Sequence, residues 1–69
     1  MKRRAILEPD LALSLNNLAV RLGEAGRRAD GLTAAQEAVD LYRELAQAEP
    51  ELYGSAADRA AELVASLAE

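Results

Sequence analysis

Three acidic side chains, Glu37, Asp40 and Glu44, are spaced so that one face of a helix would present them together. Grouped carboxylates of this kind can hold a divalent cation or act as general acid and base. No apolar residues surround this face to shift the pKa values of the carboxyl groups, so the pattern favours an ordinary solvated surface. We therefore predict no chemical site at these three residues.

Other side chains on which enzymes commonly depend are missing from the sequence. The 69 residues include no His and no Cys, which excludes the usual nucleophile–base pairs and the His/Cys metal sites. The two glycines of Gly23-Glu24-Ala25-Gly26 follow an expected helix rather than a strand, which argues against a phosphate-binding loop. The sequence thus predicts no enzyme, no cofactor and no metal.

Charge and hydropathy argue against two classes of binding partner, nucleic acids and membranes. A formal net charge of −4 argues against nucleic acid, because phosphate binding needs clustered Lys and Arg. The run Lys2-Arg3-Arg4 is the exception, and we interpret it as a solubilising terminus. No apolar run is long enough to span a bilayer and no signal peptide is recognisable, so we expect no membrane partner and a cytoplasmic location, with which the lack of Cys is compatible.

The apolar residues are mostly Ala and Leu, which are strong helix formers, and only 3% of the residues are aromatic. This composition predicts an all-α fold. We expect a first helix over about 9–25 and a second over about 29–48. Gly26 would end the first helix in a left-handed conformation, and Pro50 would stop the second.

The two ends of the chain are expected to differ. Residues 1–8 are interpreted as a basic N-terminal arm or linker. At the other end, we expect a linker over 50–54 and a third helix over 55–69, with Ser55 and Asp58 forming a capping box at its start.

Each of the first two helices has an apolar face. The first helix carries a leucine stripe, widened by two alanines, that we expect to face the core: Leu11, Leu15, Leu18 and Leu22, with Ala12 and Ala19. The apolar arc of the second helix covers nearly half of its circumference. One neighbouring helix cannot cover so wide an arc, so we expect the second helix to contact two neighbours.

Four segments together resemble a tetratricopeptide repeat of the long bacterial variety: Pro9–Ala19, Gly26–Arg28, Glu37–Val39 and Tyr42–Ala46. Within the first of them, Leu15-Asn16-Asn17-Leu18-Ala19 is similar to the signature of kinesin light chain repeats. The resemblance implies an antiparallel helix-turn-helix hairpin over 9–49. The packing positions of the repeat would then be held by Leu15, Leu18, Ala19, Leu22, Gly26, Gly31, Ala35 and Ala38.

The chain also resembles itself. Sliding it by 46 residues, which sets position 55 against position 9, aligns both the apolar residues and the segments that precede the two helices. We therefore interpret the third helix as the degraded first helix of a second repeat. Such a helix would act as a cap on the hairpin.

In the family that this chain resembles, the first helices of the repeats line a concave groove that binds peptides. Leu13, Asn16 and Val20 would lie on that surface, with Asn16 bonded to a peptide backbone and the two apolar residues against its side chains. Alternatively, Leu13 and Val20 pack on a neighbouring helix of this chain or of a second copy. The basic residue of relatives that clamp a terminal carboxylate is missing from this face, so we do not expect a chaperone-tail binder.

These features predict a non-catalytic protein–protein interaction module of the tetratricopeptide type. It would bind a peptide or protein segment, or assemble with itself through the first helix as a homodimer or higher oligomer, which would cover Leu11, Leu13 and Val20. One alternative is a minimal or engineered repeat whose activity is folding and assembly. Another is a small acidic dimeric regulatory protein whose helices resemble the repeat by chance.

Overall fold

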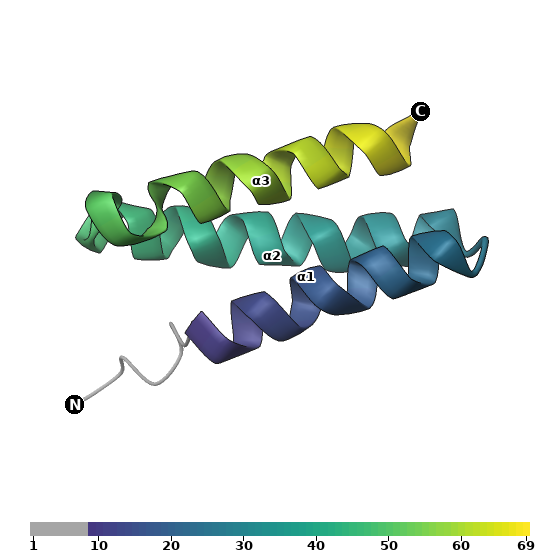
Figure 1. The fold of residues 1–69 in the computed structure, drawn as a ribbon, viewed down its shortest axis with the longest axis horizontal. Coiled ribbons are helices and arrows are strands. Elements are labelled where there is room, and N and C mark those ends of the chain that lie inside the picture. Colours follow the sequence, from purple (N-terminus) through teal and green to yellow (C-terminus); the bar gives the residue numbers. More distant parts are fainter. Residues whose placement is uncertain (1–8) are drawn as a thin grey trace.

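The computed structural model describes residues 9–69, in which three α-helices are present and no strand. Helix α1 spans Pro9–Glu24, α2 spans Arg28–Ala48 and α3 spans Pro50–Ala68. The middle helix α2 packs against both others, whereas α1 and α3 barely contact each other (Figure 1). The predictions of an all-α fold and of two neighbours for the second helix are thus confirmed. None of these three helices combines the length and the apolar character that crossing a membrane requires.

The start of the third helix differs from the prediction. The first two helices end and begin within one residue of the expected positions, but no linker occupies 50–54, because α3 begins at Pro50. A proline suits the first turn of a helix, since its ring presets φ and its missing N–H needs no partner there. Ser55 and Asp58 therefore lie inside α3 and form no capping box. The predicted arm 1–8 lies outside the described residues.

The turn between α1 and α2 is a helix-ending motif built on Gly26. This residue has a φ of 82°, in the left-handed region, as predicted. Its N–H donates to the carbonyl of Gly23 at 3.1 Å, and the N–H of Arg27 donates to the carbonyl of Leu22 at 2.8 Å. These are the two hydrogen bonds of the Schellman motif, which satisfies the last carbonyls of a helix.

The left-handed conformation makes Gly26 sensitive to a side chain. We expect Gly26→Ala to lower the free energy of unfolding by about 1 kcal/mol, because a Cβ is strained at positive φ. Gly54→Ala, inside α3, should raise it by about 0.5–1 kcal/mol through helix propensity. A Cβ added at either position meets no atom within 4 Å, so the two variants differ only in backbone conformation. Urea unfolding followed by circular dichroism measures both, and changes of the same sign would contradict the prediction.

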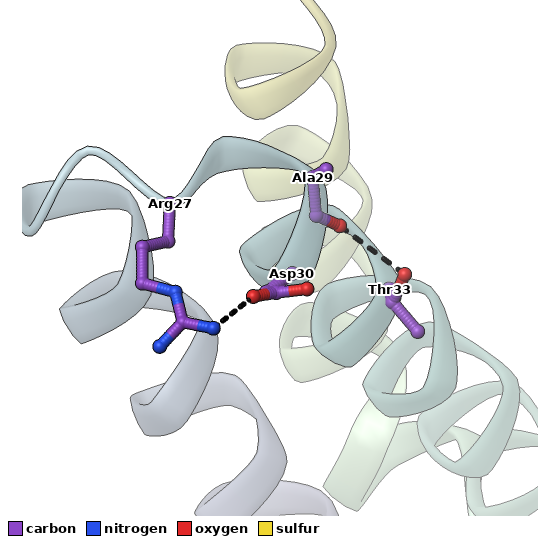
Figure 2. A network of polar contacts seen from close by, with 4 residues as sticks. All are labelled: Arg27, Ala29, Asp30 and Thr33. Atoms are coloured by element: carbon purple, nitrogen blue, oxygen red, sulfur yellow. Dashed lines mark hydrogen bonds and ion pairs between the residues drawn. The ribbon is translucent and has the colours of Figure 1, made fainter.

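The start of α2 is ordered by short-range polar contacts. Arg27 forms an exposed ion pair with Asp30, and the hydroxyl of Thr33 donates to the carbonyl of Ala29 at 3.2 Å (Figure 2). The negative charge of Asp30 in the first turn also suits the positive end of the helix dipole. An exposed pair of this kind contributes little to stability, so these contacts orient the turn rather than hold the fold.

A longer-range contact joins the start of α2 to the end of α3. The guanidinium of Arg28 donates to the carbonyls of Ser66 at 3.3 Å and Leu67 at 3.5 Å. A cation at the C-terminus of a helix satisfies free carbonyls and faces the negative end of the helix dipole. The sequence gives no sign of this contact, because the partners lie far apart in the chain.

The core consists of small side chains. Among the described residues, no large side chain is fully buried, whereas Ala12, Ala19, Ala35 and Ala38 are completely inaccessible to solvent. One cluster surrounds Tyr42. A second consists of Ala19, Ala34 and Ala35, against which the last turns of α3 pack. Because alanine fills little volume, the helix backbones must lie close together to exclude water.

Only part of the predicted apolar face of α1 packs in the core: Ala12 and Ala19 are buried and Leu15 packs against the core cluster, but two leucines of the stripe are exposed. Leu18, predicted as a packing residue, is 47% exposed, and Leu11 is 48% exposed. The contact face is instead rotated toward Ala12 and Ala19, each of which follows a stripe leucine by one residue. Small residues permit the closest approach of α1 to α2. This approach determines which face of α1 points toward α2.

Candidate functional site

A groove of about 280 Å³ lies between α1 and α3, with α2 beneath it. Its lining residues come from all three helices: Leu13 and Asn16 from α1, Tyr42 from α2, and Ala56 and Arg59 from α3. This volume is just below the usual range of small-ligand pockets, so the groove suits one or two amino-acid side chains.

Asn16 carries the one buried side-chain atom in residues 9–69 that lacks a hydrogen-bond partner, its Oδ1. An unsatisfied buried acceptor costs about 1–3 kcal/mol, so native proteins seldom retain one without a reason. The Asn16 side chain lines the groove. The groove is thus lined by a residue that also carries an acceptor without a partner in the described part of the chain.

Tyr42 and Arg59 add a hydroxyl group and a positive charge to the same groove. Tyr42 is 8% exposed. Burial raises the pKa of its hydroxyl above the ordinary value of 10.0, while the Arg59 charge acts in the lowering direction and Tyr53 acts in the raising direction. Tyr42 is therefore protonated at neutral pH and suited to hydrogen bonding. Arg59 is exposed, so its guanidinium is accessible to an anionic group.

The raised pKa of Tyr42 predicts a loss of stability in alkaline solution. The folded state holds the proton more tightly than the unfolded chain, so the full stabilisation is present below pH 10.0 and is lost as the pH rises through the pKa of folded Tyr42. We expect Tyr42→Phe to reduce this alkaline loss. The test is the midpoint of thermal unfolding, measured from pH 9 upward so that the series begins about one pH unit below the ordinary pKa of tyrosine. Tyr53→Phe should reduce the loss less than Tyr42→Phe does, because burial of Tyr42 is the largest cause of its shift and Tyr53 is a smaller one. An equal effect of both variants would contradict the prediction.

The structure brings together two of the three predicted groove residues. Leu13 and Asn16 line the groove, whereas Val20 lies further along α1, 38% exposed and outside it. Arg59, from α3, adds a basic residue to the groove, which the prediction did not include because it considered the first helix alone. The internal repeat could have indicated Arg59, because the 46-residue offset aligns Arg59 with Leu13, a residue predicted to lie on the binding surface.

The packing residues implied by the family resemblance have different environments. Ala19, Ala35, Ala38 and Gly31 are buried, Leu15 and Leu22 are half-buried, and Leu18 and Gly26 are exposed. At Gly31, an added Cβ would lie 3.1 Å from the Ala19 carbonyl oxygen and 3.3 Å from the Gly23 nitrogen. The glycine therefore permits a closer approach of the two helices here than an alanine would.

Comparisons with protein-family models, with curated proteins and with solved structures give no match for this chain. The family resemblance therefore rests on the segments quoted above. The function has to be argued from the chemistry of the groove itself.

Proposed function

We propose that the chain is a non-catalytic protein-interaction module of the tetratricopeptide type, whose groove between α1 and α3 binds a peptide or protein segment. The observation that carries the proposal is that Asn16, which lines the groove, has a buried Oδ1 without a hydrogen-bond partner in residues 9–69. A peptide offers what this atom lacks, because every residue except proline has a backbone N–H to donate.

The lining of the groove supports a particular kind of segment. Leu13 and Ala56 provide apolar walls for an aliphatic side chain. Arg59 provides a guanidinium, which binds carboxylates through charge-assisted hydrogen bonds. The preferred ligand is thus a segment in which an acidic side chain lies next to an aliphatic one.

The same residues support binding rather than catalysis. A raised pKa keeps the Tyr42 hydroxyl protonated, which suits a hydrogen-bond donor and disfavours a nucleophile. Asn16 and Arg59 provide no general base, because an amide and a guanidinium do not accept protons at neutral pH. Recognition of a segment is the activity that this set of groups can perform.

The test is a titration of the ¹⁵N-labelled chain with two synthetic peptides. One peptide has glutamates beside a central leucine, and the other has lysines in place of the glutamates. We expect the acidic peptide to shift the amide resonances around Leu13, Asn16 and Arg59, and to bind roughly tenfold more tightly than the basic one.

A charge-matched pair of variants shows whether the groove is responsible. Arg59→Glu should weaken binding of the acidic peptide roughly tenfold. Arg21→Glu makes the same change in net charge at an exposed position that does not line the groove, and should bind almost normally. If neither peptide shifts the groove resonances of the folded chain, the proposal is wrong and the structural building-block interpretation is favoured.

A further inference from the structure

A second hollow lies on a different surface of the molecule, between α1 and α2. It has a volume of about 370 Å³. Its lining joins three leucines, Leu11 and Leu15 from α1 and Leu41 from α2, with the carboxylates of Glu37 and Asp40 from α2. The prediction that no apolar residues surround these carboxylates is therefore wrong for Glu37 and Asp40. It shares no lining residue with the groove between α1 and α3.

The two carboxylates of this hollow have no cationic partner in the described part of the chain. The ion pair found there joins Arg27 to Asp30, at the start of α2 and outside the lining of the hollow. Glu37 and Asp40 are both exposed and three residues apart, so they lie on one face of α2. Beside them, Leu11 leaves 48% of its surface in water. The surface therefore combines uncovered apolar area with unpaired negative charge.

We propose that this acidic hollow docks an amphipathic helix of a partner protein, one that carries Lys or Arg next to aliphatic side chains. Two antiparallel helices leave a lengthwise depression between them, and a third helix can pack there through its apolar face. An aliphatic side chain of the partner enters among Leu11, Leu15 and Leu41, while its cations face Glu37 and Asp40. This proposal is independent of peptide binding in the groove.

Charge makes a second copy of this chain a poor occupant. In a symmetric dimer centred on the hollow, Glu37 and Asp40 would lie opposite their own copies, because an isologous interface pairs a patch with itself. Like charges held together in an interface oppose association. The net charge of −4 adds repulsion at longer range. Charge complementarity thus favours a basic partner helix.

The experiment titrates the ¹⁵N-labelled full chain with two synthetic amphipathic helices that share one leucine pattern. One has lysines flanking the leucines, and the other has glutamates at the same positions. We expect the basic helix to bind roughly tenfold more tightly, with amide shifts centred on Leu11, Leu15 and Leu41 and an affinity that falls as salt increases.

Charge reversal provides the matched control. Changing both Glu37→Lys and Asp40→Lys should weaken the basic helix roughly tenfold, whereas Glu62→Lys with Glu51→Lys, exposed positions on α3, should change it little. Three results would each overturn the proposal: no shift at the hollow, equal binding of both helices, or shifts only in the groove. So would sedimentation equilibrium showing that the free chain dimerises, together with amide resonances of Leu11 and Leu41 that shift with protein concentration.

Discussion

Replacing Gly31 by leucine should abolish the cooperative unfolding transition of this chain or move it to much lower urea. An added Cβ alone would lie 3.1 Å from the carbonyl oxygen of Ala19 and 3.3 Å from the nitrogen of Gly23. Both are backbone atoms, so neither can rotate out of the way, and α1 must move off α2. Overpacking a core commonly costs about 1–3 kcal/mol of stability. We expect the cost of moving two helix backbones apart to lie at or above the upper end of that range.

The size of the chain makes such a loss severe. A chain of this length has a total stability of roughly 3–10 kcal/mol. Urea unfolding of Gly31→Leu, followed by circular dichroism, should therefore show a much lower midpoint or, where the total stability is at the low end of this range, a largely unfolded population without denaturant. The same substitution at Gly54, where an added Cβ meets no atom within 4 Å, should preserve the transition. An unchanged midpoint for Gly31→Leu would mean that the close approach of α1 and α2 is not required.

The second large effect has the opposite sign. We expect Asn16→Leu to raise the free energy of unfolding by about 2 kcal/mol, because it removes a buried acceptor without a partner and adds apolar area to the groove wall. The same change should abolish binding of the acidic peptide, since the groove loses its hydrogen-bond acceptor. Higher stability combined with lost binding distinguishes a binding residue from a structural one.

Asn17 provides the control for this experiment. It is the next residue of α1 and is exposed, so Asn17→Leu brings the same gain in helix propensity without removing a buried oxygen. The difference between the two variants in urea unfolding isolates the contribution of the buried atom. A less stable Asn16→Leu would show that the Asn16 oxygen is satisfied in solution, and the argument for the groove would lose its main support.

Local chemistry made much of this fold predictable. Ala and Leu favour helices wherever they occur, and the effect of Gly26 on the chain depends only on its immediate neighbours. Pro50 shows the limit of such reasoning, because a proline that cannot continue one helix is also well placed to begin the next. The sequence analysis predicted that Pro50 ends the second helix but missed that it begins the third. Helix α3 therefore begins five residues before the position predicted for it, 55.

Tertiary contacts explain what the sequence did not reveal. The wheel of α1 identifies its apolar stripe correctly, but Gly31 on another helix decides that Ala19 rather than Leu18 faces α2. The residues of the groove also include some that the sequence could predict and one that it could not. Leu13 and Asn16 share a face of one helix and could be predicted together, whereas Arg59 reaches them only through the packing of α3 on α2.

The arrangement of the helices has a consequence for how the groove responds to a ligand. Helices α1 and α3 both rest on α2 and contact each other at few points, so the two walls of the groove are attached mainly to a common base. Either wall can tilt on its alanine contacts while disturbing only the few contacts between α1 and α3. The width of the groove is therefore an adjustable quantity, and a bound segment that bridges the walls would add to those few contacts.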